Sequence, residues 1–128
     1  MKMTDALTRW HQLVRSGDVS GLHSLLADNA TFHSPLVHAP QQGKEITARY
    51  LAAAFHVFFN DTFKYVREFK NSDGAALEFK VVIDGVEVNG VDLISWNENG
   101  KIDDFKVMLR PMKAINLIRE KMAAMLGA

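Results

Sequence analysis

One ionisable residue, Asp92, lies within the otherwise apolar segment from Val86 to Trp96. The segment alternates in the way a β-strand does, and residues two apart in a strand share a face. The neighbours of Asp92 on its face are Val88, Gly90, Ile94 and Trp96. A carboxyl group buried among such side chains loses its hydration, and this favours the protonated form. A protonated carboxyl can donate a hydrogen bond or a proton, so Asp92 is our candidate for a catalytic acid or electrophilic donor.

A second interpretation of Asp92 is purely structural. Trp10 can donate its indole N–H to a buried carboxylate and leave a hydrogen bond that takes no part in chemistry. Buried carboxylates are rare, and this rarity favours a role in binding or catalysis. The residue types leave both interpretations open, and in either case we expect Trp10 in the wall of a pocket.

The histidines and Ser34 offer a further set of polar side chains. His33 and Ser34 are neighbours on an expected strand and therefore point to opposite faces, which argues against a Ser-His catalytic pair. His38 follows in a loop, where we expect the mouth of a pocket and where an imidazole can take part in acid–base chemistry. We take His38 as a second catalytic candidate, the alternative being a solvent-exposed loop residue. The irregular spacing of the histidines predicts no metal site.

Composition limits the kinds of partner. The chain has 128 residues, with 15 basic and 15 acidic residues and no cysteine. This length predicts one domain, 1–128. The balanced charge disfavours nucleic acid and anionic membranes as partners, and favours a small apolar molecule. The lack of cysteine excludes disulfides and fits the cytoplasm. The mixed polar N-terminus does not resemble a signal peptide, and the longest apolar run, Leu51 to Phe59, is too short to span a bilayer.

Periodicity predicts an α+β domain. Helical spacing and capping residues predict helices over Thr4–Ser16, a short stretch after Asp18, Lys44–Phe59 and Met112–Leu126. Alternation predicts strands over Ala30–Ser34, Thr62–Phe69, Ala75–Ile83, Val86–Trp96 and Lys101–Leu109. We expect a curved, mostly antiparallel sheet wrapped around helices, with a central pocket.

Several local motifs carry a resemblance to a known family. Asp92 stands eight residues before the hairpin glycine Gly100, and the turn Ser16-Gly17-Asp18 ends the first helix. Thr31 to Pro35 looks like a strand that enters a pocket, and Gly43 precedes the long helix. In this order, the motifs resemble the cone-shaped NTF2-like superfamily, and most closely its SnoaL-like branch.

The resemblance implies cofactor-free acid–base chemistry, such as isomerisation, dehydration or cyclisation, on an apolar compound. The ketosteroid isomerases of this superfamily use an aspartate base and an oxyanion hole of a tyrosine and a protonated aspartate. The matching positions here hold Ser34, Trp10 and Asp92. Because a serine hydroxyl does not abstract a carbon-bound proton unaided, true ketosteroid isomerisation is not expected. The competing interpretation is a non-catalytic ligand-binding or dimerisation module on the same scaffold.

The resemblance also implies a pocket and a partner. We expect the ligand pocket to be lined by Trp10, Val14, Phe32, Ser34, Tyr50, Leu77, Phe79, Ile94, Phe105, Val107 and Leu109. No cofactor is expected. Proteins of this superfamily commonly form homodimers through the outer face of the sheet. Val91 and Leu93, on the face opposite Asp92, are apolar where a monomer would carry polar residues, so we expect such a homodimer here.

Overall fold

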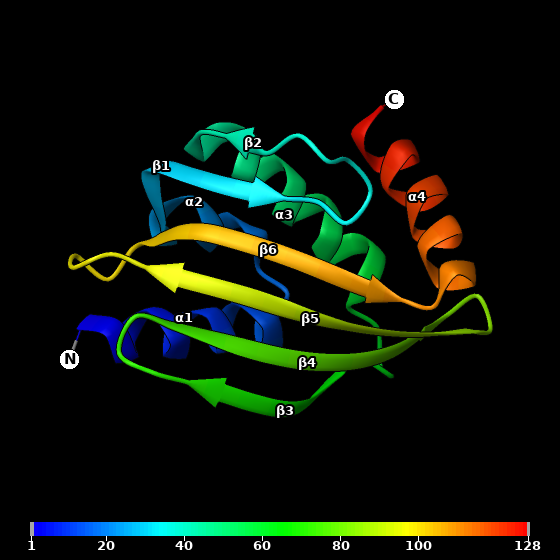
Figure 1. Cartoon of the computed structure of the whole chain (residues 1–128), viewed down its shortest axis with the longest axis horizontal. Coiled ribbons are helices and arrows are strands. Elements are labelled where there is room, and N and C mark those ends of the chain that lie inside the picture. The colour runs from blue at the N-terminus through cyan, green and yellow to red at the C-terminus, as the bar shows by residue number, and fades with distance from the viewer. Residues whose placement is uncertain (1, 128) are drawn as a thin grey trace.

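A computed structural model describes residues 2–127 of the chain (Figure 1). Its helices are α1 (Lys2–Ser16), the 3-10 turn η1 (Val19–Gly21), α2 (Leu22–Leu25), α3 (Lys44–Phe58) and α4 (Met112–Leu126). Its strands are β1 (Leu26–His33), β2 (Gln41–Gln42), β3 (Lys64–Lys70), β4 (Gly74–Ile83), β5 (Val86–Trp96) and β6 (Ile102–Arg110). No helix among the described residues is long and apolar enough to cross a membrane.

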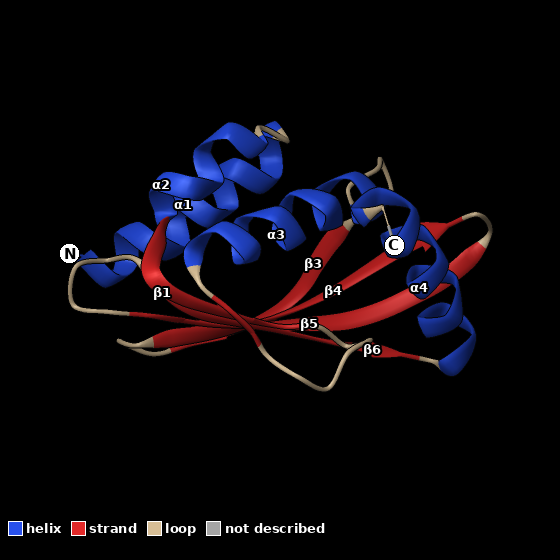
Figure 2. Ribbon diagram, turned by 90° about the horizontal axis from the view of Figure 1, so that it is seen from above, coloured by secondary structure: helices blue, strands red, loops and turns tan. Residues whose placement is uncertain are grey.

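The six strands form one sheet in the order β2-β1-β6-β5-β4-β3. Strand β1 runs parallel to β6, and every other neighbouring pair is antiparallel. Helices α1, α2 and α3 cover one face of the curved sheet, while the other face of β3 to β6 carries no helix (Figure 2). This arrangement confirms the α+β cone with a mostly antiparallel, curved sheet.

The long hairpin of β4 and β5 places Asp92 inside the domain. In β4 every second residue from Ala75 to Ile83 is buried, and in β5 the same holds from Val88 to Trp96. The turn between them uses Asp84 and Gly85 at φ 51° and 77°, the left-handed pair that a two-residue hairpin turn requires. Because the turn sets the register, Asp92 lies opposite Leu77 of β4 and faces the helices.

Helix α4 closes the end of the sheet at which β6 stops (Figure 1). It buries Ala114, Ile118 and Met122, and it packs against α3, β5 and β6. An ion pair of 2.8 Å between Lys121 and Asp84 joins this helix to the β4–β5 turn. The C-terminal helix therefore completes the core that the sheet and α3 begin.

The first third of the chain differs from the sequence-based expectation. Strand β1 begins at Leu26 rather than Ala30, and it ends before Ser34. Its register against β6 shifts between Leu26 and Thr31, where two exposed residues interrupt the alternation and hide the strand. The two polar residues of β2 have no strand pattern of their own, and they pair through their backbone with Thr31 and Phe32.

Candidate functional site

Asp92 is a buried acid on the inner face of the sheet. Only 6% of the residue is exposed, and its strand neighbours are Leu77 of β4 and Val107 of β6. Among the buried residues of the described chain, Thr47 is the other polar one, and its hydroxyl donates to the carbonyl of Ala30. Asp92 is therefore the buried ionisable group that the fold has to accommodate.

A chain of hydrogen bonds from two other elements ends at Asp92. The Tyr65 hydroxyl of β3 donates to Oδ2 of Asp92 at 2.7 Å. The indole Nε1–H of Trp10, on α1, donates to the same hydroxyl at 3.0 Å. Trp10 thus acts through Tyr65 and makes no direct hydrogen bond to Asp92, which corrects the structural interpretation suggested by the sequence. The arrangement brings three elements together at one carboxyl group.

Burial controls the ionisation of this pair. Burial raises the pKa of Asp92 from 3.8 to about 7, and the hydrogen bond from Tyr65 opposes that rise. The pKa of Tyr65 lies well above its ordinary value of 10.0, because the hydroxyl is buried and the charge of Asp92 disfavours a phenolate. At neutral pH Tyr65 is therefore a neutral donor, and a substantial fraction of Asp92 is protonated.

The contacts of Asp92 leave one of its oxygens available. The hydrogen bond from Tyr65 uses Oδ2, and no described residue bonds to Oδ1. No buried side-chain oxygen or nitrogen in the described part of the chain lacks a partner, so Oδ1 retains some access to open space. That space is the cavity that Asp92 lines.

The cavity beside Asp92 is small and aromatic. Its volume is about 30 Å³, which is room for one or two water molecules. Its walls come from α1, α3, the α3–β3 loop and the sheet, and they consist of Trp10, Leu51, Ala54, Phe55, Phe58, Phe59, Phe63, Phe79, Asp92, Phe105 and Val107. We call this space the aromatic cavity. Since its lining is almost wholly apolar, the Asp92 carboxyl is the group that would interact with a polar atom of a ligand.

The phenylalanines of the aromatic cavity pack closely on one another. Phe63 stacks on Phe79 with 5.2 Å between ring centroids, and Phe59 meets the Phe63 ring edge-on at 4.6 Å. Phe79 in turn occupies the place that a side chain at position 90 would fill. A Cβ added to Gly90 would come within 2.5 Å of Cζ of Phe79 and 2.8 Å of the carbonyl oxygen of Met108. Gly90 therefore makes room for the aromatic floor of the cavity.

His11 and Glu68 hold α1 against β3 beside the hydrogen-bond chain. A hydrogen bond of 2.9 Å joins His11 Nε2 and Glu68 Oε1. The His11 ring also meets the Tyr65 ring edge-on at 5.5 Å between centroids. Trp10 precedes His11 in the sequence, and Tyr65 packs against the His11 ring. The contact between His11 and Glu68 therefore stabilises the approach of α1 to β3 that the Trp10–Tyr65 hydrogen bond requires.

The residues predicted for the pocket divide into three groups. Trp10, Phe79, Phe105 and Val107 line the aromatic cavity together with Asp92. Val14, Phe32, Tyr50, Leu77 and Ile94 do not line it and pack within or against the core. Phe32, for example, contacts Tyr50 and Phe105, with 5.4 and 6.1 Å between ring centroids.

The third group lies in a separate groove. Ser34, His38 and Leu109 line an open space of about 560 Å³ between the loop after β1, the end of β6 and α4. We call it the loop groove, and its lining is completed by His33, Pro35, Val37, Pro40, Lys106, Val107, Met108 and Ile115. Ser34 accepts a hydrogen bond from the backbone N–H of Leu36, so its hydroxyl stabilises the loop. His38 thus lies apart from Asp92, in a groove that shares only Val107 with the aromatic cavity.

Tyr65 is the polar residue of the site that the sequence did not reveal. It lies in the segment Lys64–Lys70, where charged residues surround it and most positions are exposed. The sequence could point to Tyr65 as an inward-facing residue only if the pairing of its strand were known. Tyr65 lies opposite Phe79 of β4, and this register turns its side chain to the inner face of the sheet. Sequence reasoning likewise does not single out the cavity residues Phe55, Phe58, Phe59 and Phe63, since aromatic residues on a helix and in the loop after it are typical of any core.

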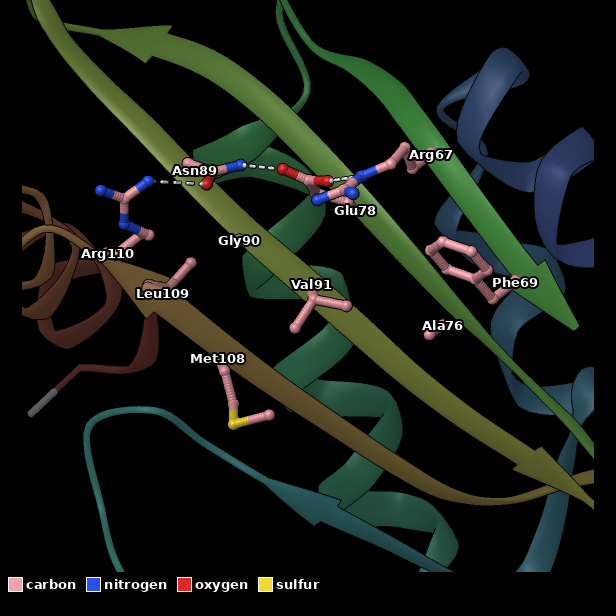
Figure 3. Close-up of a pocket in the computed structure, with 10 residues that line it drawn as sticks. All are labelled: Arg67, Phe69, Ala76, Glu78, Asn89, Gly90, Val91, Met108, Leu109 and Arg110. Atoms are coloured by element: carbon pink, nitrogen blue, oxygen red, sulfur yellow. Dashed lines mark hydrogen bonds and ion pairs between the residues drawn. The ribbon is translucent and has the colours of Figure 1, made fainter.

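A third hollow lies on the outer face of the sheet (Figure 3). A polar ladder crosses four strands there: Arg67 pairs with Glu78, Asn89 donates to Glu78 at 3.0 Å, and Arg110 donates to Asn89 at 3.3 Å. Beside the ladder the hollow, of about 300 Å³, is lined by Phe69, Ala76, Gly90, Val91, Met108 and Leu109. Within the described residues, no group of three histidine or acidic side chains is placed to hold a metal ion.

Comparison with known proteins identifies the family. Residues 7–105 match the SnoaL-like domain. A steroid delta-isomerase from Pseudomonas aeruginosa is 34% identical, with 98% of this chain and 92% of that chain covered and a TM-score of 0.93. A bacterial protein with a cystatin-like fold from Silicibacter pomeroyi DSS-3 is also 34% identical, covering 93% and 83% of the two chains, with a TM-score of 0.85.

A more distant structure agrees in fold alone. An NTF2-like protein from Mesorhizobium loti is 17% identical, covers 86% of this chain and 92% of that chain, and has a TM-score of 0.73. No curated protein matches this sequence. The sequence match and the architecture of this chain agree: the chain belongs to the SnoaL-like family and has an NTF2-like fold.

Proposed function

We propose that this protein binds a small apolar molecule at Asp92 and carries out cofactor-free acid–base chemistry on it. The observation that carries the proposal is the 2.7 Å hydrogen bond between Tyr65 and a buried Asp92 in an otherwise apolar cavity. Tyr65 donates to Oδ2, so the proton of a neutral Asp92 is free to reach a ligand from Oδ1. The ligand atom that accepts it is a carbonyl or hydroxyl oxygen.

Asp92 has the properties of a proton donor at neutral pH. Its pKa of about 7 lies close to that range, where a general acid combines the right protonation state with a driving force for transfer. Donation to a carbonyl oxygen stabilises the negative charge that develops when a neighbouring C–H bond breaks and a water molecule accepts the proton. Donation to a hydroxyl oxygen helps that group to leave as water. Both outcomes belong to the isomerase, dehydratase and cyclase class.

True ketosteroid isomerisation is not part of the proposal. The similar Pseudomonas aeruginosa protein is described as a steroid delta-isomerase, and its substrate class makes a steroid a natural comparison. In this chain the lining of the aromatic cavity contains no carboxylate or imidazole besides Asp92. Ser34 faces the loop groove and stabilises the loop there. Without a positioned base, transfer of a carbon-bound proton between two positions loses a contribution of about 10²–10⁴-fold.

A binding module without catalysis is the second candidate function. The small volume of the aromatic cavity and its single acidic side chain favour it. In that case Asp92, held by the hydrogen bond from Tyr65, would recognise a polar atom of a ligand and leave it unchanged. The two candidates share the site and differ in whether a proton moves.

We further propose a homodimer through the outer face of the sheet. Val91 and Leu93 are half-buried on this face, and the exposed side chains of Phe69 and Met108 extend the apolar area (Figure 3). The ladder residues lie beside it and carry both signs of charge, which suits a surface that meets a copy of itself.

Exchange of ketone hydrogens separates the candidate functions. Acetone, the smallest ketone, exchanges the hydrogens beside its carbonyl slowly in D₂O, and donation from Asp92 to the carbonyl oxygen accelerates that exchange. We expect the wild-type protein to accelerate it and Asp92→Asn to lose about 10²–10³-fold of the acceleration. Binding without acceleration would support the module. If Asp92→Asn binds and exchanges acetone as the wild type does, the proposed role of Asp92 is wrong.

A further inference from the structure

The aromatic cavity and the loop groove meet at one residue, Val107. This side chain lines both spaces, and only 8% of the residue is exposed. Asp92 is its direct neighbour on β5, and Lys106 precedes it on β6. Val107 is therefore part of the wall between a buried acid and an open groove.

Neither space alone suits an organic ligand. The aromatic cavity, at about 30 Å³, is too small for a benzene ring, which occupies engineered cavities of about 150 Å³. The loop groove, at about 560 Å³, has the size of a ligand site but is open to solvent and holds no buried acid. Joined through Val107, they would make one elongated site with an enclosed end and an open end.

The open end has a basic character. His33, His38 and Lys106 contribute to its lining, and no lining residue carries a carboxylate. His33 is paired with Asp104 at 2.9 Å, whereas Lys106 makes no ion pair with any described residue. A carboxylate at the open end would therefore meet an available ammonium group.

Apart from Ser34, the rest of the groove is apolar. Pro35, Val37, Leu109 and Ile115 line it, and Val37 is 44% exposed. An apolar chain lying along these residues would cover exposed hydrocarbon on its way from Lys106 to Val107. The combined site thus offers three kinds of contact in sequence: a cation, an apolar channel and a buried proton donor.

We propose that the two spaces are compartments of one binding site, with Val107 as the partition, and that its ligand is an elongated apolar carboxylic acid with a carbonyl or hydroxyl group at its far end. The carboxylate lies at Lys106, and the far oxygen accepts a hydrogen bond from Asp92. This proposal rests on the proposed function and adds the substrate class and the route by which the ligand reaches Asp92. Movement of the Val107 side chain opens the cavity to the ligand.

The probe for the test is 6-oxoheptanoate, an unbranched carboxylic acid with a methyl ketone at its far end, and its methyl ester is the uncharged control. A ketone quenches indole fluorescence on contact, so Trp10 reports entry into the aromatic cavity. Trp96 is the other tryptophan, and its indole donates to the carbonyl of Ser72. A Trp96→Phe background therefore leaves Trp10 as the single reporter.

We expect the acid to quench Trp10 in the wild type and to shift the His38 ring signals in an NMR titration at the same time. Val107→Ala should tighten binding of the acid about tenfold or more by removing part of the partition. Val88→Ala, which removes the same atoms from a buried valine that lines neither space, should not tighten it. The NMR titration of the wild type remains decisive if Val107→Ala does not fold.

Lys106→Gln tests the charge. It should weaken binding of the acid about fivefold to tenfold and leave the methyl ester unaffected, while Lys80→Gln on β4 should change neither. The two-compartment proposal is overturned if the acid shifts His38 without quenching Trp10. It is also overturned if the acid and its ester bind every variant equally, or if the acid binds neither the wild type nor Val107→Ala at millimolar concentration.

The ester keeps this outcome separate from the proposed function. If the ester quenches Trp10 and loses affinity in Asp92→Asn, the donor role of Asp92 stands even when the carboxylic acid proposal fails. If the ester binds Asp92→Asn and the wild type alike while the acid still depends on Lys106, the acid-binding groove stands and the donor role fails.

Discussion

The Tyr65 hydroxyl and the Asp92 carboxyl share a 2.7 Å hydrogen bond between β3 and β5, across the intervening strand β4. Tyr65 receives the indole N–H of Trp10 on its oxygen and directs its own proton to Asp92. The relation has two consequences. It moderates the rise in the pKa of Asp92 that burial causes, and it leaves the second carboxyl oxygen to the cavity.

Tyr65→Phe should raise the pKa of Asp92 further, because the lost hydrogen bond lowers that pKa in the wild type. It should also lower the free energy of unfolding by about 1–3 kcal/mol, since the Trp10 N–H loses its acceptor in a buried place. Carboxyl-carbon NMR and urea unfolding measure the two effects. Tyr50→Phe is the matched control, because the Tyr50 hydroxyl makes no hydrogen bond to a described residue. If the pKa of Asp92 is the same in Tyr65→Phe as in the wild type, the hydrogen bond from Tyr65 does not influence the ionisation of Asp92.

Asp92 should make stability fall as pH rises. Its folded pKa of about 7 exceeds the ordinary value of 3.8, so the folded state binds this proton more tightly than the unfolded state does. The stabilisation is complete below about pH 4, declines between pH 4 and 7, and levels off above the folded pKa. At about 1.4 kcal/mol per pKa unit, the decline amounts to roughly 4 kcal/mol.

The variant Asp92→Asn isolates this effect. An asparagine keeps the shape of the side chain and does not ionise. The free energy of unfolding of the variant, relative to that of the wild type, should therefore increase as pH rises from 4 to 7. Denaturant unfolding at several pH values measures the difference, and every other titrating group contributes equally to both proteins. If the stability of the two proteins changes with pH in parallel, burial does not shift the pKa of Asp92.

Gly90→Ala should destabilise the protein by about 1–3 kcal/mol. The new Cβ would approach Phe79 and the Met108 carbonyl oxygen to within 2.5 and 2.8 Å, and the backbone oxygen has little freedom to move. Thermal unfolding measures the loss of stability. Ala76→Gly on the outer face of β4 is the control, because it shows how much an exchange between glycine and alanine changes the stability of a strand when no clash is involved. A stable Gly90→Ala with unchanged ligand binding would show that the Phe79 ring is not fixed by position 90.

Val91→Lys should convert the proposed homodimer into a monomer, because a charge at the centre of an apolar interface loses its hydration. Sedimentation of the wild type at micromolar concentration should give twice the mass of 14.3 kDa, and the variant should give the single mass. Val82→Lys, at an exposed site of β4, should leave the dimer intact. A wild-type protein that sediments as a monomer contradicts the proposed interface.

The sheet was predictable because its inner strands bury one face. Leu77, Phe79 and Val81 alternate with exposed or half-buried residues, and the same period in β5 identified the face of Asp92. The Asp84-Gly85 turn fixed the hairpin and so the neighbours of Asp92. These signals are local, and local patterns are what a single sequence carries.

The partner of Asp92 was not predictable in the same way. Trp10 and Tyr65 are 55 residues apart, and their hydrogen bond depends on how α1 crosses the sheet. The register of β3 against β4, which turns Tyr65 inward, shifts between Tyr65 and Arg67. The split between an aromatic cavity and a loop groove arises from side-chain packing around Val107, and periodicity does not describe it.

Asp92 is a buried acid, and burial favours retention of its proton close to neutral pH. Titration of its carboxyl carbon by NMR tests this directly, with Asp92→Asn used to assign the signal. The structure predicts a midpoint near 7, well above the ordinary value of 3.8. A midpoint at or below about 4 would show an ionised structural acceptor for Tyr65, and the proposed acid–base function would lose its donor.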